Sequence, residues 1–316
     1  MTGEKIKPIV KGLIKLIPGM TEVLPKKMET GGTIESKYCY SVWMRHLINW
    51  NKHYRSIPEK VAELGPGDSL GTGLAALLSG SKCLYALDVI QFWDNKRNLE
   101  IFEELVEYFK NKLNIPDHSD YPKVKPTLDH YSFPSHILSD NILKNALVES
   151  RLNAIRKEIM DIHNPNNSFI KCFIPWHSSE IIQNNAVDFI YSQAVLQHVN
   201  DLENTYYAMQ QWLKPAGLTS HSIDFKSMGL TQTWNGHWTF SDLEWKIVKG
   251  KKTYLINRLP ISKYLEFHEK YGLEILQKEP YYMDNKLSKN QMSPRFRNLS
   301  GEDITTSGVY ILAKKK

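Results

Sequence analysis

The chain has 316 residues, of which 41% are hydrophobic and 23% charged, a composition typical of a soluble globular protein with a large core. Its formal net charge of +6 is modest for this length, and nucleic-acid-binding proteins usually concentrate such charge in a patch, so we expect no nucleic-acid partner. The three cysteines have no metal-ligand spacing and suit free thiols, and no apolar window is long enough to span a membrane, so we expect a cytoplasmic protein.

Two helices are expected before the first strand. Residues 5–17 alternate apolar and basic positions with a helical period, which predicts an amphipathic helix. This helix could make a weak peripheral contact with an anionic membrane, or it could dock on the domain or on a second subunit of an oligomer. Pro8 and Gly12 weaken a free helix, which favours docking. Residues 36–50 form a stronger helix candidate, with Ser36 as its N-cap.

The segment from Val61 to Gly71 predicts a strand that ends in a glycine turn. A second apolar run, 83–87, ends at Asp88, which lies 17 residues beyond Gly71. This order is typical of a parallel α/β sheet that holds a nucleoside. Gly65 and Gly67 let the backbone turn tightly and approach the ligand, and Asp88 can accept hydrogen bonds from both ribose hydroxyls.

Glu63 distinguishes between the possible nucleosides. The glycines also fit a loose dinucleotide pattern, but a pyrophosphate has no use for a carboxylate directly before the turn. A ligand with a cationic amino-acid tail does. Glu63 therefore indicates S-adenosylmethionine rather than NAD(P).

The next strand expected after residue 92 comes only at 169–174, so residues 99–165 are predicted to be an insertion. The insertion contains a helix at 99–113, a proline-rich crossing and a helix at 139–162. Because ligands bind beyond the carboxyl ends of parallel strands, we expect a helical cap on the substrate side. An outer layer used for dimerisation is the alternative.

The second half of the chain predicts four more strands, 187–191, 218–225, 273–279 and 308–313, with a helix at 262–271 and a surface loop at 294–303. The 218–225 strand is unusual because it carries Thr219, Ser220, His221 and Ser222 in succession, where buried parallel strands are normally apolar. A polar network facing a site would explain it. Alternation places Ser220, Ser222 and Asp224 on one face and His221 on the other.

Three segments together resemble the motifs of class I S-adenosylmethionine-dependent methyltransferases: residues 59–92, 187–199 and 212–217. The resemblance covers about half of the chain. It implies a doubly wound, Rossmann-like α/β fold, with a seven-stranded sheet whose last strand runs antiparallel beside the sixth. It also implies that residues 59–316 form the catalytic domain and that residues 1–58 form a helical segment closing over the cofactor. One feature departs from the family: residues 170–176 contain no acid to bind the adenine amino group, which leaves adenine to backbone groups near Ile174.

The resemblance and the residue chemistry together nominate a cofactor site. Arg45 could pair with the methionine carboxylate, or it could be a solvated charge; Tyr38 could contact the cofactor tail, or it could be core. The full set of expected cofactor-binding residues is Tyr38, Arg45, Glu63, Gly65, Gly67, Ser69, Asp88, Val89, Trp176, Ser192 and Gln193.

For catalysis, many sugar and natural-product O-methyltransferases resemble this chain in having a histidine after the fourth strand and an acid at the end of the fifth. His198 and Asp224 match these positions, so His198 is the expected general base and Asp224 its orienting partner. His221 and His237 are alternatives. Mg²⁺ held by Asp224, His237 and Asp188 is a further possibility that the spacing does not demand.

The expected acceptor is a small molecule or glycan. The chain lacks the Asn-Pro-Pro-Tyr-like quartet of amine methyltransferases, and aromatic side chains near the fifth strand suit sugar rings: Trp234, Trp238, Trp245 and Tyr254. The pattern resembles bacterial methyltransferases of polysaccharide biosynthesis, which implies O-methylation of a sugar or glycan precursor. The alternatives are N- or O-methylation of a small natural product, and non-catalytic binding of S-adenosylmethionine.

Overall fold

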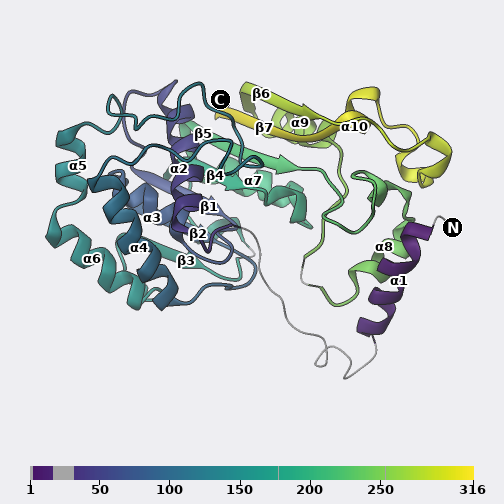
Figure 1. The fold of residues 1–316 in the computed structure, drawn as a ribbon, viewed down its shortest axis with the longest axis horizontal. Coiled ribbons are helices and arrows are strands. Elements are labelled where there is room, and N and C mark those ends of the chain that lie inside the picture. The colour runs from purple at the N-terminus through teal and green to yellow at the C-terminus, as the bar shows by residue number, and fades with distance from the viewer. Residues whose placement is uncertain (1–2, 17–31, 177, 253) are drawn as a thin grey trace.

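A seven-stranded sheet organises the chain, in the order β3-β2-β1-β4-β5-β7-β6 (Figure 1). The structure is a computed structural model and describes residues 3–16, 32–176, 178–252 and 254–316. β1 to β5 are parallel, and β7 lies antiparallel between β5 and β6, which confirms the expected doubly wound sheet. The strands are β1 Lys60–Leu64, β2 Cys83–Leu87, β3 Ile170–Phe173, β4 Val187–Gln193, β5 Leu213–Asp224, β6 Leu273–Tyr282 and β7 Thr306–Lys315.

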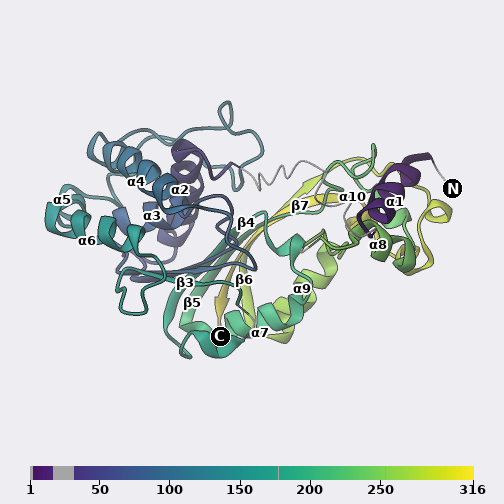
Figure 2. The same ribbon diagram turned by 90° about the horizontal axis from the view of Figure 1, so that it is seen from below.

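Helices cover both faces of the sheet. One face packs against α2, α3 and α4, with α5 and α6 completing this layer, and the other packs against α7 and α9 (Figure 2). The helices are α1 Gly3–Leu16, α2 Ser36–Asn51, α3 Gly71–Leu78, α4 Asn95–Lys110, α5 Asp140–Ala146, α6 Glu149–Met160, α7 Leu202–Trp212, α8 Asp242–Lys249, α9 Ile261–Lys270 and α10 Gly301–Thr305. Both apolar layers are continuous, as expected for a parallel sheet buried on both faces.

Helix boundaries follow the local chemistry with two departures from the sequence-based expectation. Glu35, not Ser36, is the residue preceding the first turn of α2, and Ser36 instead hydrogen-bonds to the Tyr108 hydroxyl at 2.9 Å. The helix expected at 139–162 is two helices, because the chain leaves the helical conformation at Val148 between α5 and α6. Ser139 caps α5 as its side chain accepts from Ile142 N.

An outer lobe stands beyond the carboxyl edge of the parallel strands. We define it as α1 together with residues 226–252, 254–260 and 283–305, which follow β5 or connect β6 to β7. It has two small apolar cores of its own, one around Trp238 and one around Trp245. Figures 1 and 2 show the outer lobe at one end of the molecule and α5 and α6 at the other. The surface loop expected at 294–303 belongs to this lobe and buries Phe296.

The helices of the 99–165 insertion do not form the expected cap over the carboxyl edge. Leu143, Leu152 and Ile155 join the same core as α2 and α3, and Arg151 donates to the carbonyl oxygen of Ser81, just before β2, at the amino edge. The insertion therefore thickens one helical layer, because its apolar positions find a buried face there. The outer lobe covers the carboxyl edge instead.

The amphipathic helix at the N-terminus docks on the domain, as the sequence favours. α1 packs against α8, and Lys5 Nζ forms an ion pair with Glu244 at 2.9 Å. A Cβ on Gly12 would lie 2.1 Å from the carbonyl oxygen of Ile247, so only glycine permits this close approach. Within the described residues, no helix is long and apolar enough to cross a membrane.

Arg45 is fully buried and does not face the predicted cofactor site. Its guanidinium donates to the carbonyl oxygens of Pro126 at 2.8 Å, Val124 at 3.2 Å and Pro116 at 3.2 Å, and it lies over the ring of Tyr131. The expected contact with a methionine carboxylate is therefore wrong. Arg45 holds the proline-rich crossing against α2, because the backbone carbonyls of that irregular segment need buried donors.

We expect Arg45→Met to lower the free energy of unfolding by about 3 kcal/mol, because the carbonyl oxygens lose their donors while the side-chain volume is largely kept. Denaturant unfolding followed by circular dichroism measures this change. Arg55→Met, at an exposed position just after α2, is the control and should be nearly neutral. A stable Arg45→Met protein with a specific loss of S-adenosylmethionine affinity would instead restore the carboxylate role.

Candidate active site

The glycine turn between β1 and α3 has no spare room. Gly65 and Gly67 have φ values of +66° and +76°, and a Cβ on Gly65 would lie 2.6 Å from the side chain of Val195. Gly65 N also donates to the carbonyl oxygen of Leu87 at 2.8 Å, which ties the end of β1 to the end of β2. The turn thus brings the ends of β1, β2 and β4 together, as the sequence predicts.

Glu63 lies below this turn, with only 5% of its surface exposed. The Tyr191 hydroxyl donates to its carboxylate at 3.3 Å, and no described cation pairs with it. Burial raises the pKa of Glu63 to about 8, although hydrogen bonds from Tyr191, Gly73 N and Thr72 act in the opposite direction. A buried carboxyl that lacks a cation is suited to a ligand that brings one.

Asp88 ends β2 and is 8% exposed. Burial raises its pKa to about 6, while backbone N–H groups of Val89, Ile90 and Gly67 stabilise the carboxylate. The contact with Gly67 means that the acid and the glycine turn meet, as the motif spacing predicts. Val89 itself is 44% exposed and lies beside the site rather than within the core.

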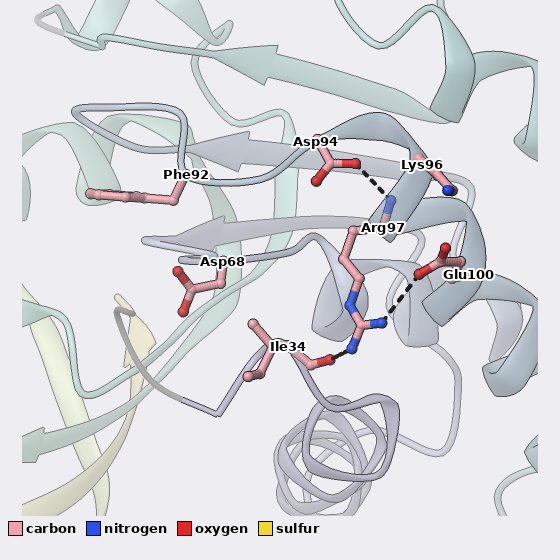
Figure 3. A pocket seen from close by; sticks show the side chains of 7 residues that line it. All are labelled: Ile34, Asp68, Phe92, Asp94, Lys96, Arg97 and Glu100. Atoms are coloured by element: carbon pink, nitrogen blue, oxygen red, sulfur yellow. Dashed lines mark hydrogen bonds and ion pairs between the residues drawn. The ribbon is translucent and has the colours of Figure 1, made fainter. Parts of the chain in front are cut away.

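A cavity of about 500 Å³ opens beside the turn (Figure 3). Asp68 borders it from the glycine turn, and Phe92 from the loop after β2. Arg97 Nη1 pairs with Glu100 at 3.2 Å on the opposite wall, and its other terminal nitrogen donates to the carbonyl oxygen of Ile34. The remaining lining residues are Asp94 and Lys96. Five of the seven lining residues are charged, and the cavity lies where residues just before α2 approach the turn.

Ser69 and Tyr38 stand close to the site, but their polar groups have different partners. Ser69 Oγ donates to the carbonyl oxygen of Thr33 and accepts from Gly71 N at 3.0 Å, so its hydroxyl is occupied within the turn. The Tyr38 ring packs edge-on against Tyr121, with ring centroids 5.5 Å apart. Burial raises the pKa of Tyr38, and the nearby Glu63 charge adds to the shift.

Trp176 follows β3 and leans toward the other face of the sheet. Its N donates to the carbonyl oxygen of Asp88 at 3.3 Å, while its ring packs edge-on against Trp212. At the end of β4, Gln193 directs a buried Oε1 that has no hydrogen-bond partner in the described part of the chain. Gln193 therefore keeps a free acceptor at the carboxyl edge.

The polar run in β5 is internal to the fold and does not face the site. Ser220 Oγ bonds to His46 Nδ1 at 2.7 Å and to the Tyr310 hydroxyl at 2.8 Å on one face. On the other face, Ser192 Oγ bonds to His221 Nδ1 at 2.8 Å. Burial lowers the pKa of His221 well below its ordinary value. Ser192 Oγ and His221 Nδ1 thus occupy one another inside the sheet, and neither residue acts as expected at the ligand.

His198 occupies the end of the short helical turn η2 (Leu196–His198), beside the carboxyl edge. Its Nδ1 is buried without a partner in the described structure, which leaves Nε2 as the nitrogen open to a ligand. Burial lowers its pKa to about 4, and the nearby Asp224 charge raises it in part. Asp224 pairs with Lys226 at 2.8 Å instead of hydrogen-bonding to His198. The two residues are therefore neighbours, but the expected orienting bond is absent here.

His237 and the tryptophans near it are core residues of the outer lobe. His237 is 1% exposed, and burial lowers its pKa to about 3. Trp234, Trp238 and Trp245 are at most 8% exposed and pack in the two lobe cores, so the expectation that they stack on a sugar is wrong. These side chains form the two lobe cores together with smaller apolar residues such as Met292 and Ile256.

The alternative Mg²⁺ site is not assembled. Asp188 lies at the start of β4, where it pairs with Lys214 at 2.6 Å and accepts from Lys60 N at 2.8 Å, while Asp224 ends β5. The strands are parallel, so these two acids lie at opposite edges of the sheet. In the described residues, no group of three or more acids, histidines and cysteines could hold a metal ion.

Tyr254 brings the outer lobe to the site, a placement that the sequence did not reveal. Its ring meets His198 edge-on with centroids 5.4 Å apart, and it meets Phe92 at 6.1 Å. Burial raises the pKa of Tyr254, and the charges of Asp68 and Asp88 contribute to the shift. Tyr254 is thus an aromatic side chain of the lobe that contacts His198 and lies near enough to Asp68 and Asp88 for their charges to affect its pKa.

Asn257 fixes the η2 turn, and no sequence motif signalled it. Its Nδ2 donates to the carbonyl oxygens of Leu196 at 2.9 Å and Val199 at 3.1 Å, and its backbone N donates to that of Gln197 at 2.7 Å. One residue of the outer lobe therefore satisfies three carbonyls around His198. Because a helical turn this short has few internal hydrogen bonds, we infer that Asn257 helps to determine where His198 lies.

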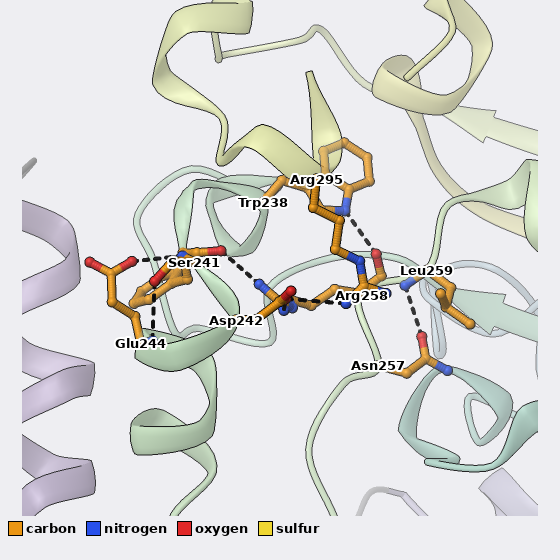
Figure 4. Close-up of polar contacts among 9 residues, drawn as sticks. Trp238, Ser241, Asp242, Glu244, Asn257, Arg258, Leu259 and Arg295 are labelled. Carbon is orange, nitrogen blue, oxygen red and sulfur yellow. Dashed lines mark hydrogen bonds and ion pairs between the residues drawn. The ribbon is translucent and has the colours of Figure 1, made fainter. Parts of the chain in front are cut away.

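Arg258 connects Asn257 to the interior of the lobe (Figure 4). It has a φ of +66° and is 4% exposed; its guanidinium donates to the carbonyl oxygen of Phe240 at 2.8 Å and pairs with Asp242 at 2.6 Å. It also lies over the Trp245 ring, and its own carbonyl accepts from Trp238 Nε1 at 3.0 Å. This network holds the 254–258 segment in place over the sheet edge.

Comparisons with known proteins find likeness in structure alone. No protein-family model matches the sequence, and no curated protein matches it. A protein from Galdieria sulphuraria, described provisionally as a sarcosine dimethylglycine methyltransferase, aligns at 14% identity over 87% of this chain and 85% of that chain, with a TM-score of 0.46. A geranyl diphosphate methyltransferase in complex with SAM aligns at 10% identity over 89% and 86%, with a TM-score of 0.44.

A SAM-dependent methyltransferase from Methanosarcina mazei aligns at 11% identity over 85% of this chain and 96% of that chain, with a TM-score of 0.42. These TM-scores are below 0.5, so the alignments carry no argument about activity. The fold assignment rests on the strand order and the antiparallel β7 of this chain itself.

The shifted pKa of Glu63 predicts a pH-dependent stability. The folded-state pKa of about 8 lies above the ordinary value of 4.5, so folding favours the protonated form. This stabilisation is present below the ordinary pKa and is lost as the pH rises through 8. Between the ordinary pKa of 4.5 and a pH above 8, the free energy of unfolding of the parent chain should fall by about 2–4 kcal/mol more than that of Glu63→Gln. Denaturant unfolding across this pH range measures the difference.

Glu269→Gln, at an exposed position near the end of α9, is the matched control and should keep the full pH dependence of the parent chain. Identical pH profiles for Glu63→Gln and the parent chain would show that the Glu63 carboxyl is not held in a low-dielectric site.

Proposed function

We propose that the chain is an S-adenosylmethionine-dependent methyltransferase. The observation that carries the proposal is the pair of buried carboxyls at the glycine turn, Glu63 without a cation and Asp88 next to Gly67 N. A ligand with an ammonium group and a ribose supplies a cation for the first and two hydroxyl donors for the second. A pyrophosphate would place negative charge beside both acids, which disfavours a dinucleotide.

The residues at the turn fit this cofactor part by part. Glu63 would receive the methionine ammonium and Asp88 the ribose hydroxyls, while the absence of a Cβ on Gly65 lets Val195 pack against the turn between them. Residues 32–35 close against the turn because Asp68 N donates to Thr33 Oγ1 at 2.9 Å, which supports the idea that the segment before β1 covers the cofactor. When bound, the cofactor supplies an electrophilic methyl group on a sulfonium.

We infer that His198 is the general base for a hydroxyl acceptor. The low pKa of about 4 keeps its imidazole neutral near pH 7, so Nε2 has a lone pair for the acceptor proton. Asn257 positions the turn that carries it, and the Asp224 charge favours the imidazolium formed after proton transfer. Alignment of the reacting groups supplies most of the rate enhancement, because this displacement needs little covalent assistance.

A sugar or glycan precursor remains the proposed acceptor, on narrower grounds than the sequence suggested. The buried tryptophans no longer support it, whereas Tyr254 beside His198 and the Asp224–Lys226 pair offer one aromatic face and polar groups at the carboxyl edge. Radiolabelled methyl transfer to sugar nucleotides and glycan extracts tests this acceptor class. S-adenosylmethionine binding without transfer to these or to small natural products would favour a binding protein instead.

Asp88→Ala should weaken S-adenosylmethionine binding by about 1–3 kcal/mol through loss of the ribose hydrogen bonds, measured by isothermal titration calorimetry. Asp129→Ala, an exposed acid in the proline-rich crossing, is the control and should leave the affinity unchanged. Unaltered affinity in Asp88→Ala, or tight binding of NAD(H) by the parent chain, would contradict the proposed cofactor.

His198→Ala should lower kcat about a hundredfold while the S-adenosylmethionine affinity stays intact, because only the proton acceptor is removed. His53→Ala, an exposed histidine just after α2, serves as the control for histidine removal and should retain full turnover. Near-normal turnover of His198→Ala would contradict the general-base role and leave His198 with a structural role at the carboxyl edge of the sheet.

A further inference from the structure

The helix α1 leaves three of its large apolar side chains exposed, although Ile9 packs against the lobe core around Trp245. Ile6, Val10 and Leu13 are 52%, 45% and 48% exposed, although they follow the i, i+4, i+7 spacing that normally marks a buried stripe. The face of α1 that docks on the rest of the outer lobe contains Pro8, Ile9 and Gly12. A docked helix would be expected to bury the stripe, so this orientation leaves an apolar surface for another occupant.

Basic side chains flank this stripe on one side. Lys7 and Lys11 each follow a stripe residue directly, lie one helical turn apart, and are both exposed. In the described part of the chain neither forms an ion pair, whereas Lys5 on the docked side pairs with Glu244. Their aliphatic stems can lie along the apolar stripe while the ammonium groups reach outward.

We propose that this surface of α1, made of Ile6, Val10, Leu13, Lys7 and Lys11, binds the surface of an anionic lipid bilayer. An amphipathic helix lying in the interface inserts its apolar stripe between head groups, and flanking lysines contact anionic phosphates. The charge argues against a second copy of the chain. A twofold interface places the same patch on both subunits and would bring the lysines of the two copies together.

The test is flotation of the full-length chain with vesicles, which reads lipid binding and is independent of the proposed methyl transfer. The chain should float with vesicles of equimolar phosphatidylcholine and phosphatidylglycerol, much less with phosphatidylcholine alone, and less as salt rises. Val10→Asp should abolish flotation. Val148→Asp is the matched control, because Val148 is 48% exposed and lies between α5 and α6, so it should float normally.

A second pair of variants tests the basic flank. Lys7→Gln/Lys11→Gln should lower the partition onto anionic vesicles at least about tenfold, whereas the exposed pair Lys123→Gln/Lys144→Gln should not. Equal binding to neutral and anionic vesicles, no binding to either, or unchanged flotation of Val10→Asp would overturn the proposal. So would a dimer seen by light scattering that dissociates in Val10→Asp, because the stripe would then be a subunit interface.

Discussion

The arrangement of the site depends on the crowded contact between Gly65 and Val195. The turn after β1 and the segment after β4 approach so closely that a single methyl group would separate them. In the same turn, Gly65 N donates a hydrogen bond to the carbonyl oxygen of Leu87 at the end of β2. The segments after β1, β2 and β4 therefore meet at this turn. A steric constraint of this kind transmits any displacement, because packed interiors have little free volume. The distances between Glu63, Asp88 and η2 are therefore set together.

The ends of β1 and β2 could be predicted from the sequence because their information is local. A glycine turn after an apolar strand, followed by an acid after the next strand, specifies one edge of a parallel sheet. The hydrogen-bond partner of a polar side chain cannot be predicted from local sequence in this way. Arg45 is as compatible with a ligand carboxylate as with backbone carbonyls in the linear chain, and its role depends on a crossing about 80 residues away. The tryptophans of the outer lobe fail for the same reason, because lobe cores and sugar platforms use the same residue type.

The polar residues of β5 show how a correct alternation can still mislead about function. The faces were predictable, but the partners were not: His46 comes from α2 and Tyr310 from β7, both remote in sequence. The hydroxyls of Ser192 and Ser220 each meet a buried imidazole, which offsets part of the desolvation cost inside the sheet. Such pairings hold only in one register of β5 against its neighbours, and the network therefore favours a single strand alignment.

The outer lobe connects the position of His198 with its basicity. Asn257 fixes the turn that carries the imidazole, and Tyr254, three residues earlier, is among the groups that shield it from water. Desolvation is the largest cause of the low pKa of His198, so the packing of the 254–258 segment governs how readily Nε2 takes a proton. An acceptor that enters beside Tyr254 would change this environment as it binds. The segment that would shape the proposed acceptor site would then also tune the proposed base, so a change in one would alter the other.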